Sequence, residues 1–488
     1  MCQRHNSPSG AMPRRDFMKT VGMAVAGVSL ATNNISGSTV AENARKIPRT
    51  PTIIRGAFIY PPSKQLQAEG YYSWPGSTFD AEGRQVQYMQ TLKQIEKRLG
   101  ITIKMEQKPL DTAEDVEKFI NEVQQTNPLG LLLIPFKKGH WEHVINIVEA
   151  SQKPAVVLAT LGVLLMPMVR QLHTRPGVYM INSPDNLAAV ENGLKMIQTH
   201  HWLQESRIVN INGTAINQLN VPDIGTQVRT IPHQDFYDAF AATKATPEVK
   251  ALYQQYLKNA KEIVEPTQAD VLEAAKTYFV LKDLIQKNHA DALMMNCLPG
   301  LKRPHQHVPP CMGYMNLRDE GIAMGCESDL DATLTMMLLQ HLFGRPGFQH
   351  NPSVDTEKNS YFGAHCTAPS KMNGLESKPE PYILRNHAEA GWGTVPRVLM
   401  QVGQEVTIAK YLSIKNSDAR PQMLLYSGEI IGIPPNPPVG GCRTNVETTI
   451  NELKDVCELK GHHLILVYGN YTKALKTYCQ LFGIEVVV

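Results

Sequence analysis

The sequence has no long apolar run of the kind that spans a membrane. Beyond its N-terminus, no stretch of about 18 unbroken apolar residues occurs in the 488-residue chain. The nearest candidate, 156–169, is interrupted by Gly162 and Pro167. We therefore expect a soluble mature protein that makes no membrane contact after removal of any leader.

The chain also lacks a strong excess of charge. Its 48 basic and 45 acidic residues leave a formal net charge of +3. A balance this even produces no concentrated field for grasping nucleic acid or an anionic membrane surface. Neither is an expected partner.

Paired cysteines are missing as well. The eight cysteines are scattered without a CxxC pair, which indicates neither a zinc ribbon nor a disulfide scaffold, so most are expected to be buried thiols. They are Cys2, Cys297, Cys311, Cys326, Cys366, Cys442, Cys457 and Cys479.

The N-terminus carries an export-like pattern. Arg14 and Arg15 open the run RRDFMK, and a mildly apolar stretch over 21–30 follows. This order resembles a twin-arginine signal peptide, with cleavage expected between about Ala31 and Ala44. A chance arginine pair in an unstructured tail is the alternative. We expect a signal peptide and linker over 1–44 and a periplasmic or extracellular protein.

The first folded region alternates short apolar runs with amphipathic stretches, which predicts an α/β domain with a parallel sheet over 45–175. Its expected strands are 53–60, 101–105, 129–135 and 155–158, and its expected helices are 86–99, 113–125 and 140–151.

A second α/β domain is expected over 176–369, and a β-rich domain rich in Gly and Pro punctuation over 370–488. The second domain's expected strands are 178–181, 207–211 and 292–297, and its expected helices are 186–199, 247–260 and 267–287.

An acidic motif is the sharpest chemical feature. The apolar run 321–326 delivers Glu327 and Asp329 just ahead of an expected helix over 332–342. Ligands bind outside the carboxyl ends of strands in open α/β sheets, and a helix N-terminus favours negative charge. Simple helix capping by Ser328 or Asp329 explains the same pattern.

Two histidine pairs are further candidates. His305 and His307 form a His-x-His segment that could hold a metal or a sugar hydroxyl, or lie in a solvated loop. His462 and His463 precede an expected strand over 464–468, where metal ligation and an ordinary turn are both compatible with the spacing.

Four more residues are lesser candidates for a polar pocket. His365, His387 and Glu389 lie beside groups able to bind hydroxyls, although each could equally decorate the surface. Arg443 follows two glycines and offers a bidentate donor to an oxygen-rich ligand, with a structural turn as the alternative.

Together these segments resemble the L-fucose isomerase and L-arabinose isomerase superfamily. The motif 323–330, running into 332–336, is similar to the family's acidic motif, and His463 with 464–469 and 481–484 is similar to its metal-histidine segment. The resemblance implies two Rossmann-like domains with open parallel sheets, a β-rich C-terminal domain, and assembly into trimers or hexamers.

The same resemblance implies a metal-dependent reaction on a monosaccharide. A divalent cation, usually Mn²⁺, chelates O1 and O2 of an open-chain aldose while carboxylates shuttle a proton through an enediol. Asp329 and His463 would be the ligands, and Glu327 the nearest spare carboxylate. The chain departs from the pattern upstream, because 304–309 holds no glutamate where the family's other metal-binding glutamate belongs. Glu320, in the following turn, is not expected to replace it.

Three functions follow from these features. The first is a metal-dependent aldose–ketose isomerase. The second is an exported glycoside hydrolase on the same scaffold, which would draw a carboxyl pair from Glu327, Asp329 and Glu389 and act on a small glycan. The third is a non-catalytic sugar-binding protein without metal.

Overall fold

The computed structural model describes residues 49–69, 80–160, 164–414, 420–435 and 441–488. The predicted export signal at Arg14 and Arg15 and the expected cleavage region lie outside these residues. Within the described ranges, no helix is both long enough and apolar enough to cross a membrane.

The first sheet has five parallel strands in the order β2-β1-β3-β4-β5. Its strands are β1 (Ile53–Ile59), β2 (Thr102–Met105), β3 (Gly130–Pro135), β4 (Ala155–Ala159) and β5 (Val178–Asn182). β3 and β4 are buried along their whole length, as expected for central strands covered on both faces. This confirms the predicted parallel sheet.

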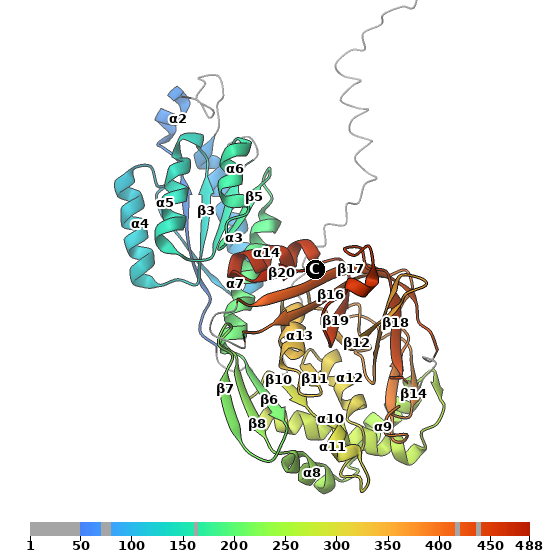
Figure 1. Ribbon diagram of the computed structural model, residues 1–488. Helices are drawn as coiled ribbons and strands as arrows, with labels where there is room; N and C mark the ends of the chain where they lie inside the picture. The colour runs from blue at the N-terminus through green and yellow to red at the C-terminus, as the bar shows by residue number, and fades with distance from the viewer. Residues whose placement is uncertain (1–48, 70–79, 161–163, 415–419, 436–440) are drawn as a thin grey trace, which may run out of the picture. The chain divides into compact units, whose positions relative to one another are not determined.

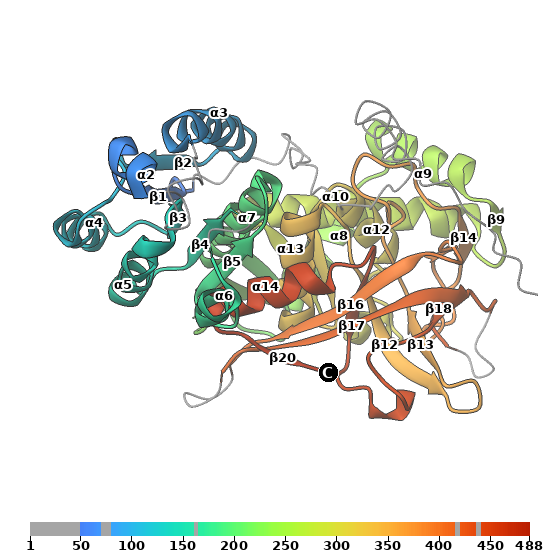
Figure 2. The same cartoon turned by 90° about the horizontal axis from the view of Figure 1, so that it is seen from above.

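Helices connect these strands and cover the sheet (Figure 2). They are α2 (Ser63–Glu69), α3 (Ala81–Leu99), α4 (Ala113–Thr126), the short η1 (Lys138–His140), α5 (Trp141–Ser151), α6 (Met166–His173) and α7 (Leu187–Glu205).

One strand assignment was wrong: 178–181 was expected to begin the second sheet, whereas β5 pairs with β4. The connection through α6 is long enough to return the chain parallel to β4.

The second sheet has the order β11-β10-β6-β8-β7 and is parallel except for the β7–β8 pair. Its strands are β6 (Arg207–Ile211), β7 (Asn217–Asn220), β8 (Gln227–Ile231), β10 (Ala292–Met295) and β11 (Ala323–Cys326). Its helices are α8 (His233–Ala242), α9 (Pro247–Asn259), α10 (Gln268–Lys287), α11 (Leu298–Leu301), α12 (Cys311–Asp319) and α13 (Leu330–Phe343).

Capping residues fix where the long helices begin. The Thr246 side chain accepts a hydrogen bond from the Val249 amide, and Thr267 forms a capping box with Asp270. Both predicted helix starts are confirmed. The helix α13 is buried on nearly every face, and it packs against α7, β11 and β16. Such a helix belongs at the centre of the molecule rather than at its surface.

The C-terminal region is a β-barrel (Figure 1). Six strands close a ring in the order β16-β19-β12-β13-β18-β17, and β17 pairs with β16 to complete it. They are β12 (Phe348–Asp355), β13 (Ser360–His365), β16 (Glu405–Leu412), β17 (Gln422–Gly432), β18 (Thr444–Thr448) and β19 (Leu464–Tyr468). The 11-residue β17 is long enough to reach both neighbours, pairing over Gln422–Glu429 with β16 and from Ile430 onward with β18.

Smaller elements surround the barrel. β20 (Glu485–Val487) adds to β17, and β9 (Glu262–Ile263), β14 (Tyr382–Arg385) and β15 (Val395–Val398) form a separate small sheet. α14 (Thr472–Phe482) and η2 (Val456–Glu458) complete the described elements. The protein is therefore mixed α/β, with parallel sheets and a C-terminal β-rich barrel that already includes β12 and β13, ahead of residue 370. The Rossmann-like description of the two sheets stays a prediction.

Candidate active site

The acidic motif forms a strained turn between β11 and α13. Glu327 and Ser328 both adopt left-handed backbone conformations, with φ of 56° and 55°. Two successive non-glycine residues in this region are unfavourable, and such strain collects at functional sites. The turn is anchored by Gln349, which accepts from the Cys326 amide at 2.9 Å and donates to its carbonyl at 3.1 Å.

Two histidines from the barrel face the Glu327 carboxylate. His365 ends β13, and His463, with φ of 51°, directly precedes β19. His365 Nε2 lies 3.6 Å from Oε1 of Glu327, and His463 Nε2 lies 3.6 Å from Oε2. Both histidine side chains are buried, whereas the Glu327 side chain keeps 35% of its surface exposed. The carboxylate is thus held from behind by two imidazoles and open on its other side.

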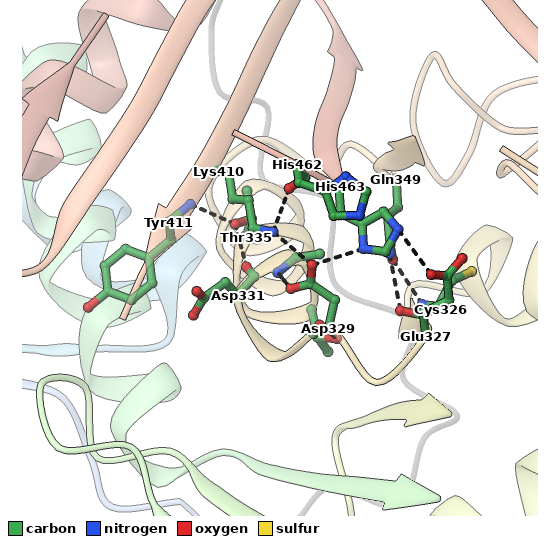
Figure 3. Close-up of polar contacts among 12 residues, drawn as sticks. Cys326, Glu327, Asp329, Asp331, Thr335, Gln349, Lys410, Tyr411, His462 and His463 are labelled. Carbon is green, nitrogen blue, oxygen red and sulfur yellow. Dashed lines mark hydrogen bonds and ion pairs between the residues drawn. The ribbon is translucent and has the colours of Figure 1, made fainter. Parts of the chain in front are cut away.

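Asp329 lies behind His463 and is fully hydrogen-bonded (Figure 3). It is the N-cap of α13, where Oδ1 accepts from the Ala332 amide at 2.8 Å. Its Oδ2 accepts from Lys410 Nζ at 2.7 Å and faces His463 Nδ1 at 3.0 Å. Burial opposes ionisation, but the contacts with His463 and Lys410 outweigh it and lower the Asp329 pKa to about 2. Asp329 therefore remains an anion that orients the His463 ring.

The donor atoms of Glu327, His365 and His463 lie within 4.8 Å of one another. Nε2 of each histidine is buried, and neither has a hydrogen-bond partner among the described residues. Two imidazole nitrogens and a carboxylate suit a divalent cation, and a carboxylate on the far ring nitrogen is the usual support of a metal-bound histidine. The His365 contact also lowers the pKa of Glu327, keeping that carboxylate ionised.

The structure brings most of the strongest candidates together. Glu327, Asp329, His365 and His463 form one cluster, and the exposed His462 ring stacks on His463 with centroids 4.1 Å apart. The group of possible metal ligands, Glu327, His365 and His463, includes His365, which was predicted only as a lesser candidate. Asp329 contacts the far ring nitrogen of His463. A direct metal bond to Asp329 stays a prediction from the resemblance.

His387 and Arg443 lie near this cluster. His387 is buried, which lowers its pKa to about 4, and the charges of His365, Arg443 and Glu327 all act on it. Arg443 Nε donates to the Asn386 carbonyl at 2.8 Å. Glu389 is exposed on the turn that follows His387.

His305 and His307 have other surroundings. The exposed His305 donates from Nδ1–H to the Leu301 carbonyl, 2.9 Å away, and stacks on Trp392. His307 is buried against Phe236, and burial lowers its pKa to about 4. None of their described contacts reaches Glu327, and a role for either histidine in substrate binding stays a prediction.

Lys410 and Gln349 support the site but were missed from the sequence. Lys410 is a buried lysine inside the apolar strand β16, and Gln349 is a fully buried amide in β12. A polar residue at an inward position of a strand is the signal that could have drawn attention to both.

A separate cavity does not include these residues. Its volume is about 870 Å³, and it is formed by α9, α10, α12 and the segment 370–382, with Asp319 and Glu320 on its wall. Glu327, His365 and His463 do not line it. The carboxylate cluster is therefore distinct from this cavity.

Comparison with known proteins gives relatives but no family model that matches. The chain is 21% identical over 441 residues to the sulfoquinovose isomerase of Priestia megaterium, covering 84% of this chain and 96% of the relative. The sulfoquinovose isomerase of Alkalicoccus urumqiensis is 23% identical over 340 residues, covering 65% of this chain and 73% of the relative. These relatives are named as sugar isomerases, which supports the predicted resemblance at the level of a sugar isomerase.

Proposed function

We propose that the chain is a sugar aldose–ketose isomerase whose reaction takes place at Glu327. One observation carries the proposal: two buried imidazoles, His365 and His463, each aim an unpartnered Nε2 at a different oxygen of the Glu327 carboxylate. Similarity to sulfoquinovose isomerases along 84% of the chain supports the reaction class.

Glu327 has the properties of a base for proton transfer between neighbouring sugar carbons. It is ionised, because its contact with His365 lowers its pKa, and its side chain is exposed on the side away from the histidines. In the proposed reaction it takes the proton from C2 of an open-chain aldose and returns it to C1, while the O2 proton moves to O1. A positioned carboxylate within hydrogen-bond reach can perform both transfers.

His365, His463 and Glu327 would hold a divalent cation, for which Mn²⁺ is the expectation. Their two buried, unpartnered nitrogens beside a carboxylate fit such an ion. When bound, a divalent cation polarises sugar oxygens and stabilises negative charge that develops on them. Asp329 and Lys410 act on this group indirectly, since together they hold the His463 ring in place.

The same contacts count against the glycoside hydrolase alternative. Cleavage by an acid and a nucleophile needs two carboxyl groups that both face the substrate. Asp329 is occupied on both oxygens by Ala332, Lys410 and His463. Glu327 and Asp329 thus do not form the free pair that hydrolysis requires.

An isotope experiment tests the proposal. Purified protein would be incubated with Mn²⁺ in D₂O with sulfoquinovose, L-fucose or L-arabinose, and the sugars followed by NMR. Isomerisation predicts an aldose–ketose interconversion with deuterium entering at C1 or C2, and Glu327→Gln should abolish it. Hydrolysis of an aryl glycoside without interconversion of any free aldose would overturn the proposal.

We also propose export by the twin-arginine route and assembly into a trimer or hexamer. The Arg14-Arg15 pattern supports the first, and the resemblance to L-fucose and L-arabinose isomerases supports the second. Replacing both arginines by lysine should retain the protein in the cytoplasm on fractionation. Sedimentation of the full chain gives the subunit number.

A further inference from the structure

Three cysteines and a histidine from separate segments meet beside His365. Cys311 begins α12, Cys366 follows β13, His387 follows β14, and Cys442 precedes β18. The donor atoms of Cys311, Cys366 and His387 all lie within 4.8 Å of one another. Interactions with Cys311 and with Cys442 both act on the pKa of the Cys366 thiol, so Cys442 also lies close to it.

The cluster is enclosed and has an unused donor. Cys311 keeps 3% of its surface exposed, Cys366 8% and His387 1%, and Val395 packs against the two thiols. His387 Nε2 is buried without a hydrogen-bond partner among the described residues. A buried nitrogen that pairs with nothing beside three thiols is unusual unless a ligand completes it.

We propose that Cys311, Cys366, Cys442 and His387 bind a thiophilic divalent cation, Zn²⁺ first, at a site separate from the Glu327 cluster. Thiolate and imidazole donors select such an ion over Mn²⁺ or Mg²⁺. A tetrahedral zinc with bonds of about 2.3 Å places its sulfur ligands about 3.8 Å apart, so the spacing of Cys311 and Cys366 needs a contraction of about 1 Å at most. Cys442 lies outside the group of three whose donor atoms are within 4.8 Å, so it would have to move in to become the fourth ligand.

The local structure suits the binding of thiolates. Cys311 is the first residue of the nine-residue helix α12, where unsatisfied amides favour a negative sulfur. A free thiol carries no charge at neutral pH, because the ordinary pKa of cysteine is about 8.5. Ion binding therefore displaces the thiol protons, and the ion neutralises charge that the pocket otherwise excludes.

His387 is the weakest of the four ligands. Its Nδ1 accepts a hydrogen bond from the Ala390 amide at 3.2 Å, which leaves Nε2 to meet the ion. Coordination through Nε2 requires the ring proton on Nδ1, and a protonated Nδ1 cannot accept from the Ala390 amide. The hydrogen bond between them is therefore lost when the ion binds. We expect His387→Ala to weaken binding about 10-fold and the cysteine variants to weaken it more.

The site would also position His365. Cys366 Sγ lies 3.4 Å from His365 Nδ1, on the side of the ring opposite Glu327. A metal-bound Cys366 thiolate would accept a hydrogen bond from His365 Nδ1–H, which keeps the ring proton on Nδ1 and leaves the Nε2 lone pair facing Glu327. This consequence rests on the proposed function, whereas the metal site itself does not.

Cobalt spectroscopy of the full chain separates the two sites. Added Co²⁺ should give one thiolate-to-cobalt charge-transfer band that saturates at one ion per chain. The band should persist in Glu327→Gln, because the Glu327 cluster offers only oxygen and nitrogen. The Co²⁺ affinity read from this band should weaken at least about 10-fold in Cys311→Ser and in the less buried Cys442→Ser. It should be unchanged in the matched control Cys479→Ser, whose thiol is buried in α14.

Two results would overturn the site. One is Co²⁺ binding to the unaltered chain without a charge-transfer band, a result that needs no variant to fold. The other is Cys366 found in a disulfide with Cys311 or Cys442 in protein purified without reductant, identified by alkylation before and after reduction. Isomerase activity with either result would leave the proposed function standing, and a cobalt–thiolate band without isomerase activity would leave the metal site standing.

Discussion

Lys410 Nζ lies 2.7 Å from Asp329 Oδ2, across 81 positions of sequence. Both side chains are largely buried, with 8% and 16% of their surfaces exposed. Lys410 also donates to the His462 carbonyl at 2.6 Å, so one ammonium group ties β16 to the start of α13 and to the turn before β19. The contact holds the barrel against the acidic turn that carries Glu327.

Asp329→Asn should destabilise the fold without disrupting α13. Asparagine caps a helix as well as aspartate does, so the Ala332 contact survives, but Lys410 loses its counter-charge in a buried position. We expect a loss of about 2 to 3 kcal/mol in the free energy of unfolding, measured by urea titration. Lys410→Met and the double variant complete the cycle, and additive effects would contradict the pairing.

Low pH should remove the difference in unfolding free energy between the unaltered chain and Asp329→Asn. The Asp329 pKa is lowered from 3.8 to about 2, so its ionised form contributes about 2 kcal/mol that is fully present above about pH 4. The contribution is lost as the pH falls from about 4 towards 2. Urea titrations of the unaltered chain and Asp329→Asn should converge over this interval. A constant difference down to pH 2 would show that the charge of Asp329 is not its source.

Glu327→Gln should remove activity while keeping the fold. Glutamine preserves the shape of the side chain but cannot accept a proton from carbon, and a positioned base contributes about 10²- to 10⁴-fold to rate. We expect kcat to fall by that factor and the melting temperature to change little. Glu357→Gln, at an exposed carboxylate in the turn after β12, is the control that should keep full activity.

Local pattern was enough to predict the turn that carries Glu327 and Asp329. The apolar run, the two carboxylates and the capped helix follow one another within residues 321–342, and both the strand and the helix form where expected. The parallel arrangement of the first sheet followed from alternating strand and helix patterns in the same way. The turn depends on contacts close in sequence, and the sheet on an alternation of strand and helix patterns that is visible along the chain.

Local pattern alone could not place the partners of that turn, because barrel closure decides them, and the pairing of His463 with Asp329 was expected only from the family resemblance. His365, Lys410 and His463 come from β13, β16 and the start of β19, which meet only through strand pairing across the ring. The segment 304–309 holds no glutamate, and the side chains that face Glu327 are His365 and His463, which lie downstream of it in the sequence. The cysteines likewise show no motif spacing, yet three of them converge.

Asp319 should be a destabilising charge at neutral pH. It ends α12 on the wall of the 870 Å³ cavity, and burial raises its pKa to about 6 despite contacts with Ser370 Oγ at 2.5 Å and the Lys371 amide at 2.8 Å. A folded-state pKa above the unfolded value of 3.8 means that stability falls as the pH rises from about 4 to about 6 and stays lower above it. The full shift corresponds to about 3 kcal/mol, and the weaker hydrogen bonds of an amide offset part of it.

Asp319→Asn should therefore stabilise the protein by about 1 to 2 kcal/mol at pH 7.5 and not at pH 4, as measured by urea midpoints. Glu320→Gln is the matched control, because Glu320 is paired with Lys282 at 2.9 Å and its loss should not stabilise at either pH. An equal effect of Asp319→Asn at both pH values would show that hydrogen bonding, rather than burial of the charge, governs this position.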